Sequence, residues 1–113
     1  MLNQVVLVGR LTSDLEITET EGGRKVANMI LAVQRTFKNQ DGIYEADFIK
    51  CSLWNAIADS TAEYCKKGDI VGIKGRLQVN SYEDKEGKKQ YSTEVIAEKV
   101  TFLSSKNSVE DEE

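Results

Sequence analysis

One segment of the chain alternates aromatic rings and a cation with apolar residues. Phe48, Lys50 and Trp54 all occupy even-numbered positions, so they share one face of an extended strand. The odd-numbered positions within 49–53 carry apolar side chains, which gives the other face the character of a core. A half-buried strand normally presents polar groups on its outer face. Two rings and a lysine on that face therefore indicate a binding surface.

The same combination of ring and cation occurs in two further segments. Its members are Arg35, Phe37 and Lys38 in one segment, and Lys74, Arg76 and Tyr82 in the other. A cation beside an exposed ring attracts phosphate, and the face of the ring accepts an unpaired base for about 1–3 kcal/mol, with little regard to base identity. Bases in a duplex are already stacked on one another. The pattern therefore predicts binding of a single-stranded nucleic acid. Its bases are expected to stack on Phe37, Phe48, Trp54 and Tyr82.

The other aromatic residues do not join this pattern. We expect Tyr64 to lie on the inward face of a helix and Phe102 to belong to the apolar end of the last strand, while Tyr44 and Tyr91 fit either a structural or a binding role. Trp54 and Tyr82, each taken alone, are also compatible with a structural role, whereas Phe48 lies opposite a face of three core residues and fits such a role less well. The repetition across three strands is what favours binding.

Turn signals and apolar runs define the elements that must position these residues. We expect strands at Val5–Leu11, which Leu15–Thr18 continues past a bend, and at Val26–Phe37, Tyr44–Trp54, Ile70–Tyr82 and Gln90–Leu103, with a helix at Ala56–Lys67. Asn55 is expected to cap the helix, and Lys66, Lys67 and Gly68 suit its end. In the fourth strand, Leu77 and Val79 are expected to face the core.

The order of three strands, one helix and two strands indicates an all-β protein. Glycines inside the long fourth strand, Gly72 and Gly75, suggest sharp bending of a small antiparallel sheet. The five-stranded OB-fold barrel, whose helix lies between strands three and four, fits this order best. An open five-stranded sheet with the helix packed on one face is the alternative.

Composition excludes several function classes. The 113 residues contain no histidine, which removes Ser-His and Cys-His catalysis and the commonest metal ligand. Two cysteines, Cys51 and Cys65, are too few for a zinc site and are expected to be buried free thiols. There is no Walker loop and no GxGxxG motif. We therefore expect no catalysis, no cofactor and no metal. Without a signal peptide or a spanning segment, we expect a cytoplasmic protein.

The negative charge is concentrated at one end of the chain. The net charge is −4, and four of the nineteen acidic residues are Glu110–Glu113, so residues 1–109 carry fifteen acidic and fifteen basic residues. We expect an OB-fold domain at 1–103 followed by a short, acidic, disordered tail at 104–113. The local arrangement of Lys and Arg, rather than net charge, decides whether the neutral domain attracts a polyanion.

Several segments resemble bacterial single-stranded DNA-binding proteins. They are Val5-Val6-Leu7-Val8-Gly9-Arg10-Leu11, Val26-Ala27-Asn28, Glu63-Tyr64-Cys65-Lys66-Lys67-Gly68, Gly75-Arg76-Leu77 and Tyr91-Ser92-Thr93-Glu94-Val95. The resemblance extends from about Asn3 to Leu103. It implies an OB-fold, usually homotetrameric, that coats single-stranded DNA in the nucleoid during replication, recombination and repair. The four candidate rings fall on positions where the family stacks bases.

The resemblance also assigns phosphate contacts and marks two departures. The family's basic positions correspond to Lys38, Lys50, Lys66 and Lys67, and strand parity adds Arg10, Arg35, Lys74 and Arg76. Asp14-Leu15-Glu16 lacks the proline that the family often has there, and the chain ends without an apolar tip. Tail-mediated recruitment of repair or replication partners is therefore not expected. A short accessory form fits, such as a paralogue linked to DNA uptake or a phage or plasmid version.

Two other classes of function remain open from the sequence. One is an OB domain that binds RNA or a protein partner, which an RNA-specific use of the 2′-hydroxyl would reveal. The other is an enzyme. A nuclease needs acidic residues clustered around two metals, whereas Glu83 and Asp84 lie in a turn beside cations and are expected to be solvated.

Overall fold

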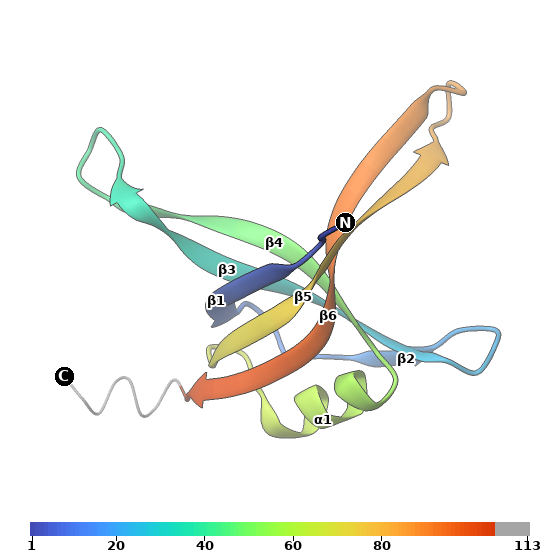
Figure 1. Cartoon of the computed structure of the whole chain (residues 1–113), viewed down its shortest axis with the longest axis horizontal. Coiled ribbons are helices and arrows are strands. Elements are labelled where there is room, and N and C mark those ends of the chain that lie inside the picture. Colours follow the sequence, from blue (N-terminus) through green and yellow to red (C-terminus); the bar gives the residue numbers. More distant parts are fainter. Residues whose placement is uncertain (106–113) are drawn as a thin grey trace.

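A computed structural model describes residues 1–105, and within them the chain forms a closed barrel. Its elements are β1 (Val5–Leu11), β2 (Ile17–Glu19), β3 (Lys25–Lys38), β4 (Tyr44–Trp54), α1 (Ala56–Tyr64), β5 (Ile70–Glu83) and β6 (Lys89–Ser104). The strand order is β1-β5-β6-β4-β3-β2, and β1 also pairs with β3, which closes the five long strands into a barrel (Figure 1). The predicted OB-type barrel is confirmed. The alternative of an open sheet is wrong, because β1 pairs with β5 on one side and with β3 on the other.

One strand differs from its predicted role. The segment expected to continue the first strand past a bend is instead a separate three-residue strand, β2, which pairs only with the start of β3. Residues 12–16 lie between β1 and β2 and make no ladder contact. The last strand, β6, ends at Ser104, one residue past the expected end of the domain. Residues 106–113, most of the predicted tail, lie outside the described residues.

The barrel interior is filled by the alternate residues that the strand pattern predicts. Leu31, Cys51, Leu53 and Ile73 are almost fully buried, together with Val71. In β4 the predicted parity holds for Cys51 and Leu53, which are buried, and for Phe48 and Lys50, which are exposed. Ser52, expected on the outer face with Phe48 and Lys50, is instead only 2% exposed. The outer face of β4 is therefore open at Phe48 and Lys50 but covered at Ser52.

Two long hairpins extend beyond the barrel. The β3–β4 and β5–β6 pairs leave it in different directions (Figure 1). The prediction that Leu77 and Val79 face the core is wrong, because these side chains are 47% and 60% exposed. The parity is right, since Leu77 pairs with the buried Val95. By this point, however, β5 is leaving the barrel for the projecting hairpin.

The bend at which β5 leaves the barrel coincides with Gly75. The register between β5 and β6 shifts between Lys74 and Gly75, so Glu98 is an extra residue on β6. A Cβ at Gly75 would overlap the backbone carbonyl of Ile96 and lie 3.2 Å from the Cα of Ala97. Only glycine permits this close approach of two backbones. The expectation of a bend at a strand glycine is met at this position.

The helix is shorter than predicted at its C-terminal end. It ends at Tyr64, and the following Cys65 is extended, so Lys66 and Lys67 belong to a loop. The backbone N–H groups of these lysines donate to carboxylate oxygens of Asp69 and Asp14, both at 2.8 Å, and these bonds hold the chain out of the helix. Gly68 does adopt the expected positive φ, at 94°, but within the loop rather than beside the helix.

The two other expectations for the helix are also wrong. Asn55 makes no side-chain cap bond, because its Oδ1 accepts the backbone N–H of Lys25 at 3.2 Å instead. Tyr64 is 70% exposed rather than packed inward. With nine residues, α1, the one helix within residues 1–105, is too short to cross a membrane.

Both thiols are free and buried, which leads to a prediction about their reactivity. Burial, followed by the nearby charge of Glu94, raises the pKa of Cys51 to about 11, and burial also raises the pKa of Cys65. The thiolate is the reactive form. We expect both thiols to be nearly inert toward Ellman's reagent at pH 8 in the folded protein and to react promptly in urea. Fast reaction of the folded protein would contradict the burial.

Candidate nucleic-acid interface

The outer face of β4 carries a row of ring, cation and ring. Phe48 is 69% exposed, Lys50 is exposed, and Trp54 closes the strand in a half-buried position. Across the ladder, Phe48 lies opposite the small side chain of Ala32, so its ring stands clear of its neighbour on β3. Strand pleating sets the spacing of the row. The row offers two flat apolar faces with a positive charge between them.

The indole of Trp54 is held in place at the edge of a cavity. Its Nε1 donates to the Oγ of Ser52 at 3.3 Å, which fixes the ring's orientation. The cavity, of about 390 Å³, is lined by Trp54, Arg76 and Gln78, with Arg24 and Ile96. The guanidinium carbon of Arg24 lies 4.7 Å from the ring centroid. The structure therefore brings the candidates Trp54 and Arg76 together and adds an arginine to them.

Arg24 was missed by the sequence analysis, although the strand register contains a signal for it. Val26 pairs with Trp54 across the β3–β4 ladder. Arg24 precedes Val26 by two residues and therefore has the same parity. The position of Arg24 beside Trp54 follows only from the register between β3 and β4. The residue pattern within one β-strand does not reveal it.

The other two candidate rings lie on the projecting hairpins. Phe37, near the end of β3, and Tyr82, near the end of β5, are both largely exposed. The two hairpins point in different directions (Figure 1), so Phe37 and Tyr82 lie on separate projections of the fold. The four rings are therefore spread over the barrel and the two projecting hairpins. This arrangement suits an extended ligand better than a compact one.

Arg35 differs from the other candidate cations because acidic residues neutralise it. Its guanidinium donates to the carboxylate of Asp47 at 2.9 Å and to that of Glu45 at 3.1 Å. The hydrogen bond and charge of Asp47 raise the pKa of Arg35, followed in effect by Glu45. A phosphate would have to compete with two carboxylates for these donors. Lys50 has no such competitor within 4 Å among residues 1–105.

This difference between Arg35 and Lys50 gives a testable contrast. We expect Lys50→Ala to weaken binding of an oligo-dT more than Arg35→Ala does, and to make its salt dependence shallower by about 0.7 in log–log slope, the value for one phosphate contact on a single strand. Fluorescence anisotropy across a salt series measures both quantities. Equal effects of the two substitutions would contradict the argument from the ion pairs.

Four further candidate cations lie away from the β4 row. Arg10 donates to the carbonyl of Gly68 at 2.8 Å, and Lys74 lies on the outer face of β5 opposite Val6 of β1. Lys66 and Lys67 are exposed in the loop after α1. These residues add positive charge around the barrel, but the structure does not place them beside the candidate rings.

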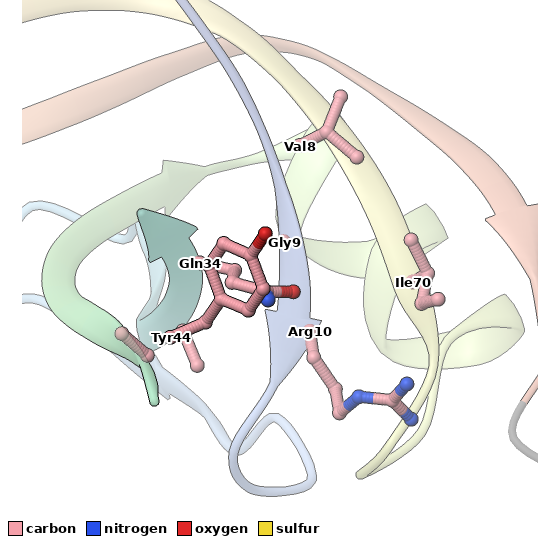
Figure 2. A pocket seen from close by; sticks show the side chains of 8 residues that line it. Val8, Gly9, Arg10, Gln34, Tyr44 and Ile70 are labelled. Carbon is pink, nitrogen blue, oxygen red and sulfur yellow. The ribbon is translucent and has the colours of Figure 1, made fainter. Parts of the chain in front are cut away.

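A second cavity, also of about 390 Å³, is lined by residues of β1, β3 and β4 and by Ile70 of β5. Tyr44, Gln34 and Gly9 all line it, and Figure 2 shows the guanidinium of Arg10 directed away from the Tyr44 ring toward the Ile70 side. The ammonium of the candidate Lys38 lies 5.6 Å from the centroid of Tyr44. Tyr44, whose role the sequence left open, thus contacts a candidate cation.

Within residues 1–105 there is no group of three or more side chains of the metal-binding types close enough together to hold an ion. Asp84, one of the two acidic residues considered for catalysis, accepts the backbone N–H groups of Glu86 and Lys88, both at 2.9 Å. These bonds lower the pKa of Asp84, with Lys88 giving the largest effect. Its carboxylate is thereby engaged in closing the β5–β6 turn.

The architecture defines the class of protein. A closed five-stranded barrel with one helix between the third and fourth long strands, and with exposed rings on its outer face, is an OB-fold. A sequence model of the single-strand binding protein family matches residues 2–103, and the chain belongs to this family.

Curated relatives agree with this assignment over nearly the whole chain. Single-stranded DNA-binding protein B of Bacillus subtilis is 51% identical over 106 residues, which cover 94% of each chain. Single-stranded DNA-binding protein 2 of Listeria innocua is 50% identical over 97% of this chain and 69% of its own length. The single-stranded DNA-binding protein of Halalkalibacterium halodurans is 52% identical over 96% of this chain and 64% of its own length.

Proposed function

We propose that the protein binds and coats single-stranded DNA without strong sequence preference. The observation that carries this proposal is the row on β4 of exposed Phe48, exposed Lys50 and half-buried Trp54, which pairs flat apolar faces with a positive charge. Membership of the family and the printed names of the relatives support the same ligand. Bases stack on the rings, and lysine and arginine side chains neutralise the phosphates between them.

The β3–β4 and β5–β6 hairpins extend this binding surface. Phe37 and Tyr82 provide further stacking positions on the β3–β4 and β5–β6 hairpins, and a strand that follows them wraps around the barrel. Phosphate contacts come from Lys38, Lys50 and Arg76 near the rings, and Arg10, Lys66, Lys67 and Lys74 contribute farther away. Arg35 contributes less, because Asp47 and Glu45 already neutralise it. The protein acts without catalysis, cofactor or metal.

For assembly we propose a homo-oligomer, with a homotetramer as the expected state. Residues 5–9 of β1 pair with β5 on one side, whereas the pairing of β1 with β3 is confined to Arg10 and Leu11. The open edge and the exposed side chains of Val6 and Val8 favour pairing with another copy.

The cellular role we propose is DNA replication, recombination, repair or DNA uptake, in the cytoplasm with the nucleoid. The high coverage of the B. subtilis relative, at 94% of both chains, supports comparison with a protein of similar length. We predicted that the tail recruits no repair or replication partners. The tail lies almost wholly beyond Ser105, the last described residue, so this stays a prediction.

Light scattering after size exclusion, with and without oligo-dT, tests binding and assembly together. We expect one oligomer, near four chains, whose mass increases by that of bound oligonucleotide at low salt and returns to the free value at high salt. A monomer would refute the assembly alone. Absence of a complex at low salt would refute the binding function.

Two competitions separate the alternatives. Matched single-stranded RNA should compete less well than DNA if DNA is the ligand, whereas stronger competition by RNA would favour an RNA-binding OB domain that uses the 2′-hydroxyl. A labelled oligonucleotide incubated with magnesium should stay intact. Cleavage would restore the enzyme hypothesis.

A further inference from the structure

Arg24 is fixed by its backbone at the start of β3. The backbone N–H of Thr20 donates to the carbonyl oxygen of Arg24 at 2.7 Å, which closes the turn between β2 and β3. From this anchor the exposed side chain reaches over the end of β4, where its guanidinium carbon lies 4.7 Å from the Trp54 centroid. This is within the distance of a cation–π contact. One ring of the β4 row is thus already covered by an arginine.

The charge around this indole is not balanced by acidic residues. Arg24 and Arg76 both line the cavity at Trp54, and within residues 1–105 neither guanidinium lies within 4 Å of a carboxylate. Arg76 donates instead to the side-chain oxygen of Gln78 at 3.1 Å. By contrast, the neighbouring Lys25 pairs with Asp59 at 3.2 Å. Two unneutralised guanidinium groups beside one ring favour an anion at this position.

We propose that Arg24 is a nucleotide-binding residue that rests on Trp54 in the free protein and moves to the phosphate of the nucleotide whose base stacks there. The proposal rests on the proposed binding of single-stranded DNA. A base overlaps more of the indole than a guanidinium does, so it displaces the arginine from the ring. The displaced group stays tethered at the rim of the cavity by the β2–β3 turn, with its planar set of five N–H donors free to bind phosphate oxygens.

Trp54 is the chain's single tryptophan, so its fluorescence reports on this position alone. In the free protein, Arg24→Ala should uncover the indole and increase quenching by acrylamide. In oligo-dT titrations, the same variant should bind more weakly, with a log–log salt slope shallower by about 0.7, the loss of one phosphate contact. Oligo-dT should quench Trp54 in the wild-type protein, because a base takes the place of the guanidinium.

Two further variants separate charge from position. Lys25→Ala removes one positive charge from the neighbouring residue, whose side chain pairs with Asp59, and should leave both the acrylamide quenching and the salt slope near their wild-type values. Arg24→Lys keeps the charge but loses the planar group. It should therefore retain most of the salt slope while showing increased quenching by acrylamide.

The outcomes distinguish this inference from the function on which it rests. If the wild-type protein binds oligo-dT but Arg24→Ala has the salt slope of Lys25→Ala, Arg24 merely covers the ring and the inference is wrong. Binding without quenching of Trp54 would also overturn it, because no base would then stack on the indole. If the wild-type protein does not bind oligo-dT at low salt, the proposed function fails, and the role of Arg24 fails with it.

Discussion

Phe48→Ala is expected to weaken binding of oligo-dT by about 1–3 kcal/mol, which is roughly 5- to 150-fold in Kd. The ring is 69% exposed and lies opposite Ala32, so its removal takes away a stacking surface with little loss of packing. We therefore expect the free energy of unfolding to stay close to that of the wild-type protein. Anisotropy titrations measure the affinity, and urea denaturation checks the fold.

Tyr64→Ala is the matched control for this substitution. Tyr64 is 70% exposed, nearly the same as Phe48, but it lies on α1 rather than on β4. If exposed rings in general held DNA, both variants would lose affinity. We expect only Phe48→Ala to do so. Unchanged binding by Phe48→Ala would remove the β4 row as the basis of the proposed function.

Gly75→Ala should cause the largest loss of stability among the substitutions considered. The added methyl group would overlap the backbone carbonyl of Ile96, and neither strand can move without disturbing the register shift at this position. Forcing an extra methyl group into a packed interior typically costs about 1–3 kcal/mol, and a clash with backbone lies at the upper end or beyond. Urea denaturation measures the change in the free energy of unfolding.

Gly72→Ala on the same strand is the control for Gly75→Ala. A Cβ at Gly72 would make ordinary contacts, the nearest being 3.7 Å from the Leu103 side chain. We expect the free energy of unfolding to change by less than about 1 kcal/mol, so that the two alanine variants differ clearly. Similar losses in both variants would mean that the close contact of Gly75 with β6 does not account for the effect, because strand propensity alone favours alanine over glycine.

The barrel and the β4 row were predictable because both follow from local alternation. Successive side chains in a strand point to opposite faces, so Phe48 and Lys50 are separated from Cys51 whatever surrounds the strand. The order of elements then restricted the closed architectures to very few. Alternation along a strand therefore predicts on which face of the strand a residue lies.

The errors arise where the surroundings decide the outcome. Leu77 and Val79 have core parity but sit where the strand projects from the barrel, and strand length alone does not reveal where the barrel ends. Arg35 is neutralised by carboxylates across the β3–β4 ladder, and Arg24 reaches Trp54 through the register of the same ladder. Both relations depend on pairing between strands, which the pattern of either strand alone does not contain.

The two diverging hairpins have a consequence for how a ligand leaves the protein. Parts of a fold that project from the core with few buried contacts open at a lower free energy than the core itself. Single-stranded DNA bound as proposed is therefore released first from one hairpin, at Phe37 or Tyr82, while the barrel still holds the middle of the DNA. A competing strand can occupy the vacated hairpin before the first has departed. Exchange between two DNA molecules then accelerates with competitor concentration, instead of waiting for complete dissociation.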